Sequence, residues 1–146
     1  MREKDKSLNE VYFFWMDRAM KAQRKAKNRF FKKLGVDLTS DQWIILKRLS
    51  EVENQTQKEL ADAVSKDPAS ITRSLDILEK NGMIERRSAD RRSFMVLLTK
   101  QGQGLVDKVI PEAVIYRQKG ISGLSEKDMK TFKKVLDTIY INFSRE

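Results

Sequence analysis

The sequence predicts a mainly helical fold that carries one small β-hairpin (α+β). Apolar residues recur at intervals of three and four through most of the 146 residues, which is the helical period. Only after Gly82 do two short extended segments follow each other across a polar link. We see no internal repeat and no low-complexity linker, so we expect one domain over residues 1–146.

The N-terminal part predicts one long helix from Ser7 to Leu34. It contains no Pro or Gly, Ser7 and Glu10 form a capping-box pattern, and Gly35 is suited to the C-cap. Residues 11–16 are apolar around the whole circumference, which favours burial against a second chain. A single wide contact inside the monomer is the alternative.

The centre of the chain predicts three helices, the last two joined by a tight turn. The first spans Thr39 to Glu51 and the second Gln57 to Val64. The third starts at Pro68 after the N-cap Asp67 and ends at Asn81-Gly82. Two short helices joined in this way are a helix-turn-helix candidate.

A hairpin follows the third of these helices. Residues 83–87 and 93–98 have the character of short strands, and residues 88–92 form a polar turn between them. Such a hairpin beside a helix-turn-helix is a wing. We therefore predict that residues 39–99 form a winged helix-turn-helix core.

The C-terminal part predicts two further helices. Thr99 caps the first, Pro111 should bend it, and Gly120 and Gly123 mark the break before the second. The second begins at Ser125 and keeps an apolar stripe. We assign residues 7–34 and 100–146 to helices that flank the core.

The composition of the chain limits the classes of function and partner that we consider. The net charge of +9 and a pI near 9.8 favour an anionic partner, nucleic acid first and an acidic membrane second, with an unpartnered basic surface as the alternative. Cys and His are both absent, which removes thiolate chemistry and the commonest general base and metal ligand. We therefore expect that the protein is not an enzyme and that it binds neither a cofactor nor a metal ion. No apolar run approaches the roughly 20 residues of a membrane span, so we expect a cytoplasmic protein that does not bind membranes.

The second helix of a helix-turn-helix enters the major groove, where its first side chains meet base edges. Here Ile71, Leu75 and Leu78 form the inward face. The entrance and outward positions supply hydroxyls, cations and small side chains: Ser65, Lys66, Ala69, Ser70, Thr72, Arg73 and Ser74. We expect Arg73 at a guanine or a phosphate. An ordinary amphipathic helix with a polar outer face is the alternative.

Four arginines surround the hairpin turn, where core packing requires none. A narrow minor groove attracts inserted arginine, and a neighbouring carboxylate can hold such a guanidinium in position. The candidate wing residues are Arg86, Arg87, Asp90, Arg91 and Arg92. A solvated charged turn is the alternative.

Residues 71–102 resemble the MarR family of winged-helix regulators. The first part of the family pattern stands at Thr72, Arg73, Leu75, Leu78, Glu79, Gly82, Met83, Ile84 and Arg86, and the second at Asp90, Arg91, Arg92, Val96, Leu98, Thr99 and Gly102. Residues 57–61 look like the family's first motif helix. The resemblance thus covers residues 39–102, and the flanking helices match only in length and apolar pattern.

This resemblance implies a bacterial-type, sequence-specific regulator that binds double-stranded DNA as a homodimer on a near-palindromic operator. It places Arg92 in the minor groove, Arg91 at phosphates and Asp90 as the group that orients the wing arginine. We expect residues 7–34 and 100–146 to be dimerisation helices, with the contact at Leu8, Val11, Tyr12, Trp15, Phe132, Leu136, Ile139 and Tyr140. Family members often release DNA when a small aromatic or anionic effector binds, and the expected role is repression. The sequence identifies neither the effector nor the operator.

Eight cations and no acid lie between residues 18 and 33. A solvated helix face is the interpretation we favour, and the alternatives are an extended phosphate footprint, an anionic effector and a membrane surface. A basic helical adaptor for RNA or an anionic membrane surface is the rival function. Neither of those partners needs the wing at residues 90–92.

Overall fold

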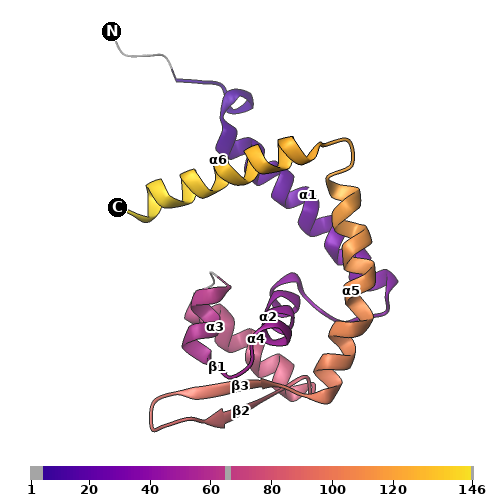
Figure 1. The fold of residues 1–146 in the computed structure, drawn as a ribbon, viewed down its shortest axis with the longest axis vertical. Helices are drawn as coiled ribbons and strands as arrows, with labels where there is room; N and C mark the ends of the chain where they lie inside the picture. The colour runs from indigo at the N-terminus through magenta and orange to yellow at the C-terminus, as the bar shows by residue number, and fades with distance from the viewer. Residues whose placement is uncertain (1–4, 65–66, 146) are drawn as a thin grey trace. The chain divides into compact units, whose positions relative to one another are not determined.

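A computed structural model describes residues 5–64 and 67–145 (Figure 1). The elements in chain order are a 3-10 turn η1 (Leu8–Glu10), α1 (Tyr12–Lys33), α2 (Ser40–Glu51), β1 (Gln55–Thr56), α3 (Gln57–Ala63), α4 (Pro68–Lys80), β2 (Ile84–Ser88), β3 (Phe94–Leu98), α5 (Lys100–Gly120) and α6 (Glu126–Ser144). The predicted class, mainly α with a small β-hairpin, is confirmed. No helix in the described part is long and apolar enough to span a membrane.

The chain divides into two compact units, residues 1–112 and 113–146. The first unit holds every element from η1 to β3 together with the start of α5. The second holds the end of α5 and all of α6. The boundary falls beside Pro111, whose ring removes one backbone donor from a helix that nevertheless continues to Gly120.

The start of α1 differs from the prediction. The sequence indicated one helix from Ser7, but Val11 is extended (φ −94°, ψ 115°) and separates η1 from α1. The Ser7 N–H donates to the Glu10 carboxylate at 3.1 Å, so this pair closes the short turn and leaves the long helix to begin at Tyr12. The sequence could not show this break, because Val11 fits the apolar helical period as well as its neighbours do.

The end of α1 is as predicted. Gly35 adopts φ +67°, and the Val36 N–H donates to the Phe31 carbonyl at 3.0 Å, which is the Schellman arrangement. Phe31 is 2% exposed and meets Trp43 of α2 edge-on, with ring centroids 6.4 Å apart. The C-terminal end of α1 is thereby anchored on α2.

The central helices begin at the residues that the sequence indicated. Thr39, Thr56 and Asp67 cap α2, α3 and α4, each accepting a backbone N–H three residues on. Their apolar faces meet the sheet in a core made by Ile45, Leu46, Leu49, Leu60, Ile71, Leu75, Leu78, Ile84 and Val96. The helix-turn-helix is therefore packed on one side only, and its polar side stays open to a partner.

The sheet has three antiparallel strands in the order β1-β3-β2. In the hairpin, Ile84 pairs with Leu98 and Ser88 with Phe94. Strand β1, in which Gln55 pairs with Val96, was not predicted, because two residues are too few to show the alternation of apolar and polar side chains that marks a strand. Asn54 has φ +57° and leads into this short strand.

The start of α5 is tied to the turn between α4 and β2. The Thr99 hydroxyl donates to the Gly82 carbonyl at 2.7 Å and accepts the Gly102 N–H at 3.0 Å. Gly82 itself is left-handed (φ +77°). Gly102 is buried so tightly that an added Cβ would lie 2.1 Å from the Met83 carbonyl oxygen. Only glycine fits at this crossing.

Arg86 joins the hairpin to α4. Its guanidinium donates to Asp76 at 2.6 Å and to Glu79 at 3.0 Å, and its backbone N–H donates to Glu79 at 3.0 Å. The hydrogen bond from Arg86 holds the pKa of Glu79 below its usual value, and Glu79 in turn raises the pKa of Arg86. The Arg86 side chain is only 20% exposed. We call this contact the Arg86 clamp.

We predict that Gly102→Ala destabilises the fold by about 1–3 kcal/mol, because the new methyl group overlaps backbone atoms. The matched control is Gly104→Ala, two residues along the same helix, where an added Cβ meets nothing within 4 Å. The control should be neutral or stabilise by up to about 1 kcal/mol through helix propensity. Urea unfolding at one fixed protein concentration measures both, and equal effects would contradict the packing argument.

We predict that the Arg86 clamp makes stability depend on pH. A carboxyl group whose pKa is lowered by folding stabilises the fold above its usual pKa, which is 4.5 for Glu79, and this stabilisation is lost as the pH falls further. In Arg86→Met, the free energy of unfolding at pH 7 should fall by about 1–2 kcal/mol, and its loss on acidification should be smaller than in the wild type. Urea midpoints at neutral and acidic pH test this.

The control for the clamp is Arg87→Met. Arg87 pairs with Glu85 at 3.1 Å, but its side chain is 69% exposed, so its removal should change stability little. A parallel acid response in wild type and Arg86→Met would rule out the clamp as its source.

Candidate nucleic-acid interface

The entrance of α4 is organised by its N-cap. The Asp67 carboxylate accepts the Ser70 N–H at 2.9 Å and the Ser70 hydroxyl at 2.7 Å, and these bonds lower the pKa of Asp67. The Arg73 guanidinium donates to the Ser70 hydroxyl oxygen at 3.2 Å. Arg73 is thus exposed yet tethered to the first turn of α4. This turn is the part of a recognition helix that contacts base edges in a major groove.

Thr72 links the two helices of the motif. Its hydroxyl donates to the Pro68 carbonyl at 2.9 Å and accepts the Gln57 side-chain amide at 3.1 Å. Gln57 lies at the start of α3, and sequence reasoning did not select it as a site residue. Its only sequence signal was its place in the first motif helix of the resembling stretch.

The other predicted residues of this helix share its outer face. Ala69 is exposed next to Thr72 and Arg73, while Ser70 and Ser74 are half-buried at the edge. Ser65 and Lys66 lie outside the described residues. Among the predicted residues of this helix, Thr72 and Arg73 are therefore the exposed hydrogen-bonding side chains, and Ala69 is the small residue that permits close approach.

The tip of the hairpin is ordered by Asp90. Its carboxylate accepts the backbone N–H groups of Arg92 at 2.8 Å and Ser93 at 3.0 Å, and these bonds lower its pKa. The Ser88 hydroxyl donates to the Asp90 carbonyl at 2.9 Å. We had expected the Asp90 carboxylate to hold an arginine side chain, and the structure instead shows it holding the loop backbone.

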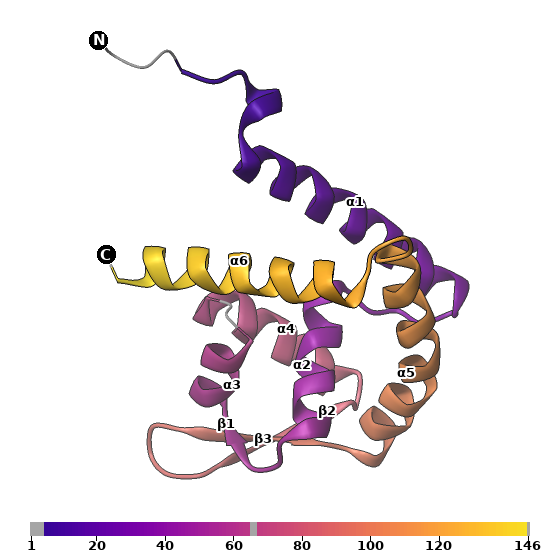
Figure 2. The ribbon, with the colours of Figure 1, turned by 45° about the horizontal axis from the view of Figure 1, so that its top comes forward.

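The four wing arginines fall into two pairs. Arg91 and Arg92 are exposed at the tip, which lies at the end of the hairpin farthest from α5 (Figure 2). Arg86 and Arg87 lie on β2 and are both ion-paired, Arg86 in the clamp and Arg87 with Glu85. The clamp acids, Asp76 and Glu79, are further residues that sequence reasoning did not assign to the site. The turn at Gly82 was predicted, but the approach of Asp76 and Glu79 to Arg86 depends on how β2 packs against α4, which no residue spacing reveals.

The residues expected at a dimer contact are not buried within the described chain. Leu8, Tyr12 and Trp15 are 66%, 56% and 47% exposed, and Phe132 and Tyr140 are 52% and 68% exposed. Val11, Leu136 and Ile139 are half-buried. Aromatic side chains at this level of exposure on two units indicate an uncovered apolar surface on each.

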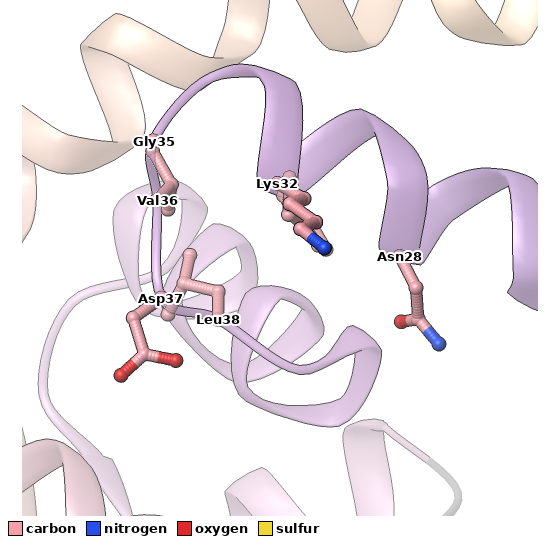
Figure 3. Close-up of a pocket in the computed structure, with 7 residues that line it drawn as sticks. Asn28, Lys32, Gly35, Val36, Asp37 and Leu38 are labelled. Carbon is pink, nitrogen blue, oxygen red and sulfur yellow. The ribbon is translucent and has the colours of Figure 1, made fainter.

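Two hollows lie along α1 in the first unit. One, of about 420 Å³, is lined by residues on both sides of Gly35: Asn28, Phe31, Lys32, Gly35, Val36, Asp37 and Leu38. Figure 3 shows Lys32 and Asn28 on the helix and the following loop beside them, with Asp37 pointing away from Lys32. The second, of about 370 Å³, is lined by α1 side chains that include Arg24 and Lys27 and by the start of α2. Across the described residues, no cluster of acidic side chains is suited to hold a metal ion.

Comparison with known proteins agrees with this geometry. The sequence model of the MarR family matches residues 38–94. An HTH-type transcriptional regulator of Bacillus cereus is 25% identical over 138 residues, which are 94% of this chain and 92% of that protein. AbsC, a MarR family transcriptional regulator from Streptomyces coelicolor, superposes with a TM-score of 0.86 at 20% identity, covering 99% of this chain and 100% of its own. BpsR of Bordetella bronchiseptica superposes with a TM-score of 0.80 at 19% identity, over 94% of this chain and 98% of its own.

The matched residues 38–94 span the helix-turn-helix and most of the hairpin, and the similarity of the whole chain extends through the flanking helices. Residues 38–94 are thus similar to the MarR family, nearly the whole chain is similar to transcriptional regulators, and AbsC shares its fold.

Proposed function

We propose that this chain is a transcriptional regulator of the MarR family and binds duplex DNA sequence-specifically, with α4 in the major groove and the hairpin tip in the adjacent minor groove. The observation that supports this proposal most is that α4 and the hairpin tip, in the same unit, each carry exposed arginines next to backbone or side-chain hydrogen bonds that order them. Arg73 is tethered to the first turn of α4, and Arg91 and Arg92 extend from a loop that Asp90 fixes through the backbone. Arg92 takes the minor-groove role and Arg91 a phosphate.

The Arg86 clamp has a positioning role in this proposal. Arg86 was among the candidate DNA contacts, but its guanidinium already serves Asp76 and Glu79. It sets the position of β2 against α4, so that the two reading elements keep a fixed relation within the unit. Arg87, which is exposed, remains a candidate for a phosphate contact.

We further propose that the regulator acts as a homodimer on a near-palindromic operator, as a repressor. The exposed apolar residues of α1 and α6 support the dimer, because the second unit buries no residue of α6. A dimer presents two copies of α4 and two hairpins, and its two-fold symmetry is matched by inverted half-sites.

A small-molecule effector is the last part of the proposal. The DNA binding of BpsR is regulated by 6-hydroxynicotinic acid. In this chain the hollow between α1 and the start of α2 has Arg24, Lys27 and Asp41 on its wall, and the exposed Arg24 is the cation that we propose for a small anionic or aromatic acid. The effector proposal is tested by screening aromatic carboxylates for compounds that raise the Tm of the protein and also abolish its DNA binding. A screen without such a compound would contradict the proposal.

We predict that Arg92→Ala weakens binding to genomic fragments selected by the protein and makes binding less dependent on salt, because the cation proposed for the minor groove is lost. Arg73→Ala should change the sequence preference by about 1–3 kcal/mol at one position in each half-site. Fluorescence anisotropy over a salt series, with single-base operator variants, measures both.

The matched control removes one exposed cation elsewhere, in Arg117→Ala on α5, and should keep both affinity and preference. Wild-type behaviour of both Arg73→Ala and Arg92→Ala would remove the site assignment. Equal binding to duplex RNA or to anionic vesicles would favour the adaptor function instead.

We predict a dimer mass of twice the 17.1 kDa chain by light scattering. Phe132→Lys should shift the mass towards the monomer, because a charge replaces an aromatic ring at the proposed contact. Phe94→Lys is the matched control, since Phe94 on β3 is also 52% exposed but lies on the hairpin. A monomeric wild type at micromolar concentration would contradict the dimer.

A further inference from the structure

The net positive charge of this protein does not lie on the helix-turn-helix and the hairpin, the elements proposed to contact the first DNA segment. Residues 40–99, which hold the helix-turn-helix and the hairpin, contain ten Lys and Arg and ten Asp and Glu. Helix α1 contains eight Lys and Arg and one acid, Asp17. It therefore carries +7 of the net charge of +9. A partner attracted by charge alone is attracted to α1.

Five of these cations form one line along the helix, which we call the α1 stripe: Arg18, Lys21, Lys25, Arg29 and Lys32. Their spacing of three and four residues keeps them on one side over about 21 Å of helix, at a rise of about 1.5 Å per residue. All five are exposed, and none is paired with a carboxylate in the part of the chain that the structure describes.

The α1 stripe lies on another side of α1 than the contact with α2, although Lys32 also lines the hollow beside residues 35–38. Phe31, which is buried against Trp43 of α2, lies about 120° around the helix from the middle of the stripe, at about 100° per residue. Helix α2 in turn contacts α4, whose Ile71 and Leu75 face the core while Arg73 faces outward. Helix α1 therefore contacts α2, and α2 contacts α4. A duplex held by α4 need not also contact the stripe.

Two anionic surfaces are candidates for the α1 stripe, a phosphate backbone and a membrane. An interfacial helix buries large apolar side chains beside its cations. Along the stripe between residues 18 and 32 only Ala22 accompanies the cations, and Phe31 on the other side is committed to the core. A nucleic-acid backbone requires only a row of cations, because the release of counterions drives binding.

We propose that the α1 stripe binds the phosphate backbone of a second duplex DNA segment, so that one regulator holds two segments together. The inference rests on the proposed function for the first segment, which α4 and the hairpin hold. The second contact is independent of sequence, since the stripe offers cations and no groups arranged to read base edges.

The experiment tethers a duplex selected by the protein to beads, adds the full-length chain, and then adds a fluorescent duplex of mixed sequence at low salt. The variant is Lys21→Gln/Lys25→Gln/Arg29→Gln, which removes three charges from the stripe. The matched control is Lys127→Gln/Lys130→Gln/Lys134→Gln, which removes three exposed charges from α6. If the stripe triple variant does not keep its thermal transition, the single charge reversal Lys25→Glu takes its place.

Wild type and the α6 control should capture the second duplex. The stripe variant should hold the tethered duplex with unchanged affinity and lose the second, with the salt slope of second-duplex capture lower by about 2.7 for three lost contacts.

Unchanged capture by the stripe variant would overturn the inference. So would an equal loss of both duplexes, which would place the stripe in the first footprint, and so would stripe-dependent binding to phosphatidylserine vesicles without capture of a second duplex. Failure of the wild type to hold the tethered duplex at all would instead overturn the proposed function.

Discussion

The structure of the first unit depends on the turn at Gly82. A left-handed residue there ends α4, and the Thr99 hydroxyl binds the carbonyl of that residue from the start of α5. Gly102 lets α5 approach the Met83 backbone closely. Three elements, α4, β2 and α5, are thus fixed by contacts made within a few residues of one another. The position of the hairpin follows from this junction, and the Arg86 clamp reinforces it at the next residues of β2.

Much of this fold was predictable because the signals are local. Thr39, Thr56, Asp67 and Ser125 cap helices by bonding a backbone N–H three residues on, and such bonds depend on nearest neighbours alone. The left-handed residues Gly35 and Gly82 were recognisable for the same reason. The helix boundaries in the centre of the chain are therefore confirmed within a residue or two.

The features that sequence reasoning missed depend on contacts between distant residues or on geometry without a side-chain signal. The extended Val11 keeps an apolar pattern across a backbone break, and β1 exists only because β3 lies beside it. The candidate site shows the same division. The exposed tip arginines and Arg73 were named from the sequence, whereas the partners of Arg86 and the Gln57 bond to Thr72 required the tertiary fold.

The bonds that Asp90 makes have a consequence for the thermodynamics of association. Because the carboxylate binds the loop backbone, the conformation of the tip is fixed without any ligand. The conformational entropy of the loop is thus lost when the chain folds, and little of it remains to be lost on meeting a partner. The Asp90 carboxylate is ionised at neutral pH, and the hydrogen bonds from Arg92 and Ser93 lower its pKa, so these bonds extend the ionised form to more acidic solution. A hairpin tip ordered in this way loses less conformational entropy on association than a flexible loop of the same length would lose.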